Sequence, residues 1–259
     1  MSFRIGDIVT IISHNHDIVF KIIEIDGDNV ILKGVDLRLY ADSYIDDLVI
    51  SDIKSNSDTK IIERHVKELN IDRSQYFYLP GRILHIDGDS EYLERCMNFY
   101  KSMGVRANGF NISEVDVKNQ IGGLLREYQP DIVVITGHDA YYKKRNDIDN
   151  IDNYQNTKNF MEAVWEARKY EKCHDKLIVI AGACQSNYEE LIKSGANFAS
   201  SPKRINLHAL DPAIIASSVA LADRNKSIDI ISLISKTKYG KEGIGGIITN
   251  GTMYVGYPR

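Results

Sequence analysis

From residue 80 onward, short apolar runs alternate with segments of helical periodicity. The runs predict strands at 82–86, 105–110, 131–136, 177–181 and 197–201. Apolar residues three and four apart predict helices at about 92–103, 117–128, 160–167 and 188–193, and a further helix that begins at Asp211-Pro212. Strands that are apolar on both faces are typical of a parallel sheet covered by helices on both sides. The sequence therefore predicts a three-layer, doubly wound, mostly parallel α/β domain over residues 80–259, with the flavodoxin-like strand order 2-1-3-4-5.

The first fifty residues follow a different pattern. Short β-branched runs at 7–12, 18–25, 29–33 and 47–50 are separated by turns such as Asp26-Gly27-Asp28. This pattern predicts a small SH3-like β-barrel over residues 1–52. Residues 53–79 are polar and charged, and we interpret them as a linker with a helix at about 59–69. Near the other end, Asn250-Gly251 separates the runs 246–249 and 252–255, which predicts a closing β-hairpin.

Composition excludes several classes of protein. The 259 residues carry 32 Lys and Arg against 36 Asp and Glu, a net charge of −4, which argues against a dedicated nucleic-acid binder. No apolar run approaches the ~18 residues of a membrane span, and no secretory signal is visible at Met1–Asp7. The three cysteines have no metal-binding spacing, so we expect reduced thiols in a cytoplasm-like compartment and no metal.

Polar residues follow three of the predicted strands. Asp87 and Asp89 follow the first, His138 the third, and Cys184 the fourth. In an open parallel sheet, ligands bind at the carboxyl ends of the strands, and neighbouring strand ends lie ~5 Å apart. His138 and Cys184 are therefore expected to face each other, where an imidazole can take the proton of a thiol nucleophile. Gly182 precedes the cysteine and permits close approach of a substrate backbone.

Each of these residues also has a purely structural interpretation. A cysteine at a strand end is often a small buried hydrophobe, and a histidine beside a carboxylate often belongs to a turn. Asp89 is well placed to cap the helix that begins near residue 92. The remaining candidates are Cys96 (core), Cys173 with His174 (incidental surface pair), His85 (packing), His208 (a loop residue within reach of the site), and His14 with His16 (a zinc site without further ligands).

Two segments resemble the caspase-like cysteine peptidases. They are Ile132-Val-Val-Ile-Thr-Gly-His138 and Leu177-Ile-Val-Ile-Ala-Gly-Ala-Cys184. The resemblance implies a caspase-like sheet, Cys184 as nucleophile, His138 as its partner and no cofactor. It also implies an oxyanion hole that includes the backbone at Gly137 and Cys184. In that clan a glycine usually follows the histidine, whereas here Gly137 precedes it and Asp139 follows.

A resemblance to the YabG family of sporulation-specific peptidases covers nearly the whole chain. It rests on five segments: Arg4-Ile-Gly-Asp-Ile-Val9, Val35-Asp-Leu-Arg-Leu-Tyr-Ala-Asp42, Arg82-Ile-Leu-His-Ile-Asp-Gly-Asp89, Pro130-Asp-Ile-Val-Val-Ile-Thr-Gly-His-Asp139 and Ala181-Gly-Ala-Cys-Gln-Ser186. The family implies an endopeptidase that is made in the sporulating cell or associates with the spore coat. It implies that spore-coat and germination proteins are cut after basic residues.

That specificity requires a carboxylate in the substrate pocket. In caspase-like peptidases the residue two before the nucleophile often lines this pocket, but here it is the uncharged Gly182. We therefore expect Asp87 and Asp89, on the neighbouring strand end, to bind the basic side chain.

Two other classes of function remain open. Asp87 and Asp89 are also typical of a flavodoxin-like receiver or ligand-binding domain without catalytic activity. An RNA-associated protein would use the amino-terminal barrel, although residues 6–47 are rich in Asp and lack paired basic and aromatic residues.

Overall fold

The computed structural model describes residues 3–51, 57–69, 74–142 and 147–258. The chain forms two compact units, residues 1–60 and 61–259. Residues 53–56 and 70–73 of the predicted linker lie outside the described ranges. The helix expected at 59–69 is α1 (Ser57–Glu68).

The amino-terminal unit is a five-stranded antiparallel sheet in the order β4-β3-β2-β1-β5. Its strands are β1 (Ile8–Ile11), β2 (Phe20–Asp26), β3 (Asn29–Gly34), β4 (Tyr40–Tyr44) and β5 (Leu48–Ile50), and the short helix η1 (Ile45–Asp47) precedes β5. Val9, Ile22, Val30 and Leu32 are completely buried in its core. Four of these strands match the predicted runs. β4 was missed because its residues are exposed or half-buried and carry no apolar stripe.

The larger unit is built on a six-stranded sheet in the order β12-β11-β10-β9-β7-β8. The strands are β7 (Ile83–Asp87), β8 (Ala107–Asn111), β9 (Ile132–Thr136), β10 (Ile178–Ala181), β11 (Phe198–Ser200) and β12 (Ile244–Gly246). The first five are parallel, and β12 runs antiparallel to β11. The predicted order 2-1-3-4-5 is confirmed, with β9 between β7 and β10.

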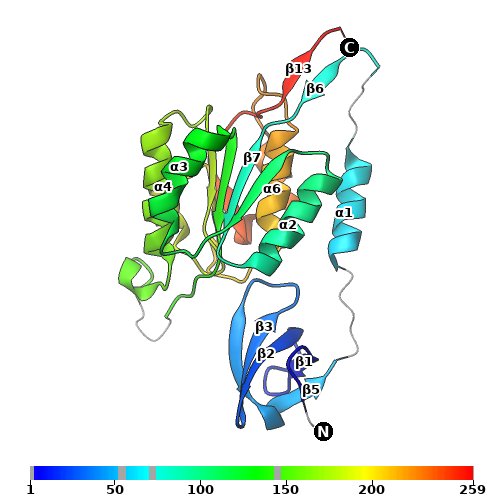
Figure 1. The fold of residues 1–259 in the computed structure, drawn as a ribbon, viewed down its shortest axis with the longest axis vertical. Coiled ribbons are helices and arrows are strands. Elements are labelled where there is room, and N and C mark those ends of the chain that lie inside the picture. Colours follow the sequence, from blue (N-terminus) through cyan, green and yellow to red (C-terminus); the bar gives the residue numbers. More distant parts are fainter. Residues whose placement is uncertain (1–2, 52–56, 70–73, 143–146, 259) are drawn as a thin grey trace. The chain divides into compact units, whose positions relative to one another are not determined.

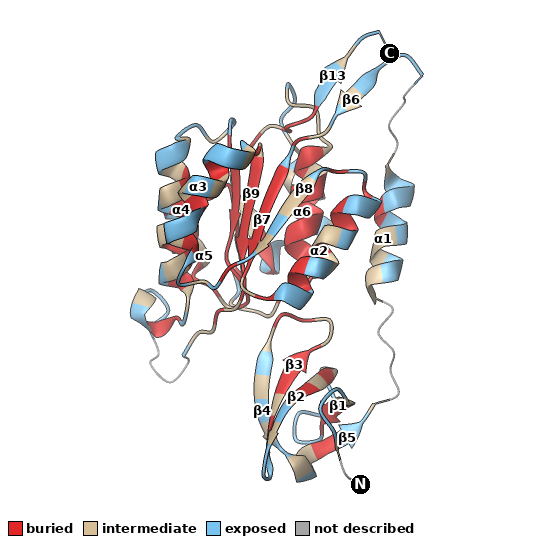
Figure 2. Cartoon of the chain, in the orientation of Figure 1, coloured by how far each residue is buried: buried red, intermediate tan, exposed pale blue. Residues whose placement is uncertain are grey.

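Helices cover both faces of this sheet (Figure 1). They are α2 (Ser90–Ser102), α3 (Val117–Tyr128), α4 (Thr157–Tyr170), α5 (Tyr188–Lys193), α6 (Asp211–Ala220) and α7 (Ile230–Ser235), with the short helices η3 (Ile151–Asn153) and η4 (Gly240–Glu242). Val134 packs with α2 and α6, whereas its neighbour Val133 packs with α3 and α4. The strands β7, β9, β10 and β11 are therefore buried on both faces, whereas the edge strand β8 is half-buried or exposed (Figure 2). Within the described ranges, no helix combines the length and apolar character needed to span a bilayer.

The predicted hairpin at Asn250-Gly251 is wrong. β13 (Tyr254–Gly256) pairs with β6 (Phe77–Leu79), the strand that comes before β7 in the chain, and β12 pairs with β11. The favoured Asn-Gly hairpin turn requires a positive φ at both residues, and neither Asn250 nor Gly251 has one. Gly251 instead packs so closely against the segment that follows α6 that a Cβ there would lie 2.1 Å from the Ala222 carbonyl oxygen.

Candidate active site

Asp89, His138 and Cys184 follow three strands of the sheet at the same distance from one row of register partners. Ile135 on β9 is the register partner of both Ile86 on β7 and Ala181 on β10. Each of the three polar residues lies three positions beyond a member of this row. Adjacent strands are ~4.8 Å apart, so the three residues follow neighbouring strand ends at the same carboxyl edge of the sheet. His138 comes from the central strand of the three.

The His138 imidazole contacts Asp89. Its Nε2 lies 3.1 Å from Asp89 Oδ2, and the two side chains are 20% and 5% exposed. The other oxygen of Asp89, Oδ1, accepts hydrogen bonds from the amides of Glu91 and Tyr92 at the start of α2. The capping interpretation of Asp89 is therefore confirmed, and the same carboxylate also reaches the imidazole.

Glu114 fixes the backbone at His138. Its Oε1 accepts a 2.7 Å hydrogen bond from the His138 amide. A Cβ at Gly137 would lie 2.2 Å from this oxygen and one at Gly88 2.3 Å, so both glycines leave room for the carboxylate. Glu114 was missed in the sequence because it lies beyond the irregularly exposed strand β8, in a loop without an apolar pattern. Its position after a strand of the parallel sheet was the available signal.

Cys184 lies in a tight turn after β10. It is 2% exposed, and its Sγ accepts a 3.1 Å hydrogen bond from the Leu207 amide. The next residue, Gln185, has a φ of 59°, a conformation that non-glycine residues rarely adopt. Gly182 has a φ of 99°, and a Cβ there would lie 2.6 Å from Leu191 Cδ1.

Asp139 connects the loops that carry His138 and Cys184. One of its oxygens accepts from the hydroxyls of Ser186 and Thr157, and the other accepts from the amides of Ala140 and Asn156. Ser186 in turn accepts a hydrogen bond from the Ala183 amide through its hydroxyl oxygen. Burial raises the pKa of Asp139 above its usual value, although these hydrogen bonds act in the opposite direction.

Asp87 is the last residue of β7. It is completely buried, its Oδ1 accepts a 2.9 Å hydrogen bond from the Asp89 amide, and its Oδ2 lies 3.5 Å from His85 Nε2. His85 is also completely buried, and its Nδ1 is 2.7 Å from the Tyr100 hydroxyl. The packing interpretation of His85 is therefore confirmed.

The structure also describes the remaining candidate residues, of which His208 directly follows Leu207, the residue whose amide contacts Cys184. Cys96 is completely buried in the core, as predicted, and Cys173 is exposed. His208 is 2% exposed, and its Nδ1 accepts a hydrogen bond from the Leu210 amide. His16 Nδ1 lies 2.8 Å from the Thr10 hydroxyl. Among the residues that the structure describes, no group of three or more His, Cys, Asp or Glu side chains is arranged to hold a metal ion.

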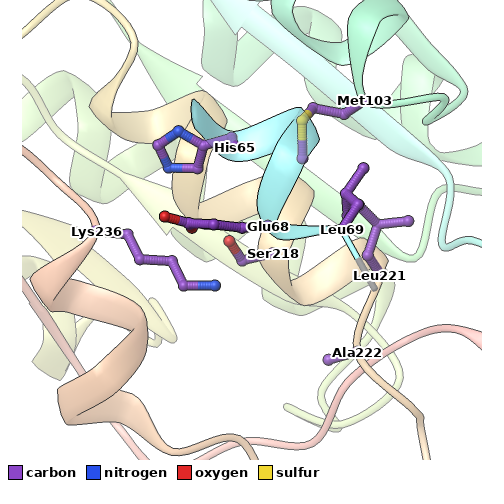
Figure 3. A pocket seen from close by; sticks show the side chains of 8 residues that line it. All are labelled: His65, Glu68, Leu69, Met103, Ser218, Leu221, Ala222 and Lys236. Carbon is purple, nitrogen blue, oxygen red and sulfur yellow. The ribbon is translucent and has the colours of Figure 1, made fainter. Parts of the chain in front are cut away.

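A cavity of about 300 Å³ opens at another place in the larger unit (Figure 3). It is lined by His65, Glu68, Leu69, Met103, Ser218, Leu221, Ala222 and Lys236. His65 is buried against the edge of Phe99, and burial lowers the pKa of its imidazole. None of the lining residues belongs to the row that carries Asp89, His138 and Cys184.

Comparison with known proteins identifies the family. The family model described as YabG peptidase U57 matches residues 4–258. The sporulation-specific protease YabG of Bacillus subtilis (strain 168) is 38% identical to this chain over 288 aligned positions, which cover 100% of this chain and 99% of the relative. The expected resemblance is therefore confirmed, and the chain belongs to the YabG peptidase U57 family.

Proposed function

We propose that this member of the peptidase family is a cysteine endopeptidase in which Cys184 is the nucleophile and His138 the acid and base. The observation that carries the proposal is the shared row, because Ile135 and Ala181 are register partners and His138 and Cys184 each lie three residues beyond them. Two hydrogen bonds between the loops, from Ser186 to Asp139 and from the Tyr141 amide to Gln185, support it.

The proposed reaction has two stages. The Cys184 thiol gives its proton to His138, and the thiolate attacks the carbonyl carbon of the scissile peptide bond. His138 then protonates the leaving amine as the C–N bond breaks, which leaves a thioester on Cys184. In the second stage His138 takes a proton from water as the water oxygen attacks the thioester carbon. The C–S bond then breaks, the new carboxyl end is released, and His138 returns the proton to the Cys184 sulfur.

The backbone around the nucleophile supplies the proposed oxyanion hole. We assign the developing negative charge to amides at Cys184 and Gly137, since preorganised amides at such a position stabilise a tetrahedral intermediate. Gly137 is buried and held by its packing against Glu114. The tight turn that begins at Gly182 holds the Cys184 backbone in place.

Cleavage after basic residues is the proposed specificity. Asp87 and Asp89 are the carboxylates expected from the sequence, but they are 0% and 6% exposed and both accept backbone amides. Glu114 is only half-buried, and its Oε2 has no hydrogen-bond partner among the described residues. We therefore propose that the Glu114 carboxylate binds the basic side chain of the substrate, and that Gly182 forms the uncharged floor of the pocket. Asp87 and Asp89 are the alternative source of negative charge.

The biological setting of the proposal comes from the family. The Bacillus subtilis relative is named a sporulation-specific protease, so we propose a role in sporulation, with spore-coat and germination proteins as substrates. The larger unit would then be a caspase-like peptidase domain and the amino-terminal sheet an SH3-like module. We propose that the protein works in the cytoplasm of the sporulating cell or at the spore coat.

The test uses the purified full-length chain with fluorogenic peptides that carry Arg, Lys or Gln before the scissile bond. We expect cleavage of the Arg and Lys peptides, and loss of cleavage after treatment with a thiol alkylator or in Cys184→Ala. The 2% exposure of Cys184 is the observation that favours a non-catalytic, receiver-like domain. Undiminished activity in Cys184→Ala would exclude the proposed mechanism.

A further inference from the structure

We infer that Asp89 is a third member of the catalytic constellation, a positioning residue that sets the tautomer of His138. The inference rests on the proposed cysteine mechanism and changes the Cys–His pair into an Asp–His–Cys row. Its basis is the 3.1 Å contact between Asp89 Oδ2 and His138 Nε2, together with the position of Asp89, His138 and Cys184 three residues beyond the register partners Ile86, Ile135 and Ala181.

The contact fixes which nitrogen of the neutral ring carries the proton. An ionised carboxylate has only acceptor atoms, so a hydrogen bond at this distance requires a proton on His138 Nε2. The neutral ring then has its lone pair on Nδ1, and Nδ1 is the atom that receives the thiol proton. When it does so, the imidazolium forms beside the negative charge of Asp89, which compensates it.

The two oxygens of Asp89 have different uses. Oδ1 accepts from the Glu91 amide at 3.0 Å and from the Tyr92 amide at 3.1 Å, and only Oδ2 reaches the imidazole. An asparagine at this position would keep the cap only if its single oxygen faced the two amides. Its NH₂ group would then face His138 Nε2 and require a lone pair there, which selects the opposite tautomer with the proton on Nδ1.

A buried chain of contacts holds Asp89 in this position. Asp87 Oδ1 accepts the Asp89 amide, and Asp87 Oδ2 lies 3.5 Å from His85 Nε2. His85 is held in turn by the Tyr100 hydroxyl on α2. The carboxylate that faces His138 is thus fixed both by its helix cap and from within the core, as a group that orients another side chain must be.

The test compares two substitutions that retain a helix cap. In Asp89→Asn and Asp89→Ser, both new side chains can accept from the helix amides, but neither presents an acceptor-only oxygen to His138. We expect each variant to lose at least ~10²-fold in kcat/KM for an Arg peptide. Melting temperatures should remain close to that of the wild-type protein.

The second readout does not depend on peptide cleavage. The rate of Cys184 alkylation by iodoacetamide is measured against pH in a Cys96→Ala/Cys173→Ala background. Without the carboxylate that compensates the imidazolium, the midpoint of this curve should move to higher pH in both variants. The matched control is Asp229→Asn. Asp229 caps α7 through amides at the equivalent positions, two and three residues later (Ile231 and Ser232), and no contact to histidine is seen among the described residues. The control should change neither readout.

The outcomes separate this inference from the proposed function. Wild-type kcat/KM and an unshifted alkylation curve in a folded Asp89→Asn or Asp89→Ser protein would overturn the role of Asp89. If Cys184→Ala instead keeps its activity, the cysteine mechanism itself fails. If one variant does not fold, the other decides, because each lacks the acceptor.

Discussion

The Ser186 hydroxyl donates a 2.8 Å hydrogen bond to the buried Asp139 carboxylate. The two residues lie just beyond Cys184 and His138, so this bond joins the loops that carry the proposed nucleophile and base. Thr157 at the start of α4 donates to the same oxygen. One carboxylate thus connects two strand ends and a helix, and it does so inside the protein, where an ionised group is poorly solvated.

This burial predicts a specific pH dependence of stability. Because the pKa of Asp139 is raised above 3.8, the folded protein binds more protons than the unfolded chain between 3.8 and the raised value. The contribution of Asp139 to stability should therefore be greatest below pH 3.8 and should fall as the pH rises through that window. Other carboxylates titrate in the same range, so the quantity to measure is the difference in unfolding free energy between wild type and Asp139→Asn. Parallel curves from pH 3 to pH 7 would contradict the prediction.

The cysteines should separate catalysis from packing. Cys184→Ala should abolish peptide cleavage even where the variant is folded, although the loss of a side chain that is 2% exposed and accepts the Leu207 amide should also lower its melting temperature. Cys96→Ala should lower the unfolding free energy by ~1–3 kcal/mol and keep its activity at permissive temperature, because Cys96 is completely buried beside the Ala209 carbonyl. Both variants are compared by chemical denaturation and by initial rates. A stable, fully active Cys184→Ala enzyme would mean that another residue attacks the substrate.

The histidines provide a second comparison. His138→Ala should cost at least ~10²-fold in rate, as is usual for a general acid and base. His208→Ala should cost far less in rate, although the removal of a buried ring should reduce stability. Rates are measured well below each melting temperature. An equal loss of rate in His208→Ala would assign that imidazole to the reaction as well.

The Glu114 carboxylate, which we propose binds the basic side chain of the substrate, can be replaced by an amide of the same shape. In Glu114→Gln the side-chain oxygen still accepts the His138 amide, but the negative charge is lost. We expect the preference for Arg over Gln before the scissile bond to fall by ~10–100-fold, the range of one hydrogen bond to a charged group. Asp116→Asn, in the same loop, is the control and should keep the preference. If Glu114→Gln also keeps it, the charge comes from Asp87 or Asp89.

Strongly patterned segments made the core of the fold predictable. β7, β9 and β10 are buried at every position, and the mostly apolar runs in β9 and β10 are hard to mistake. Their order followed from the rules for parallel sheets. From the strand positions and their order, the sequence predicted that His138 and Cys184 follow neighbouring strand ends.

Other features depend on contacts between distant parts of the chain. The pairing of β6 with β13 joins segments that are more than 170 residues apart, and no local pattern reports it. Asn250-Gly251 has the composition of a hairpin turn, but Gly251 packs against Ala222, a residue 29 positions earlier in the chain, and adopts no such turn. The cap of α2 was the structural alternative that the sequence offered for Asp89, beside substrate binding. The second contact of Asp89, with His138, required the register of β7 against β9. Glu114 was missed because it lies in a loop, where the sequence has no hydrophobic periodicity.

The pairing of β6 with β13 also has a consequence during synthesis. A ribosome makes residues 77–79 long before residues 254–256, so β6 must wait for its partner until almost the whole larger unit has been translated. An unpaired strand in a nascent chain presents open backbone groups to any other extended segment. The order of translation therefore makes this ribbon one of the last parts of the domain to close. A ribosome that stalls before residue 254 would hold a nascent peptidase whose β6 edge is still open.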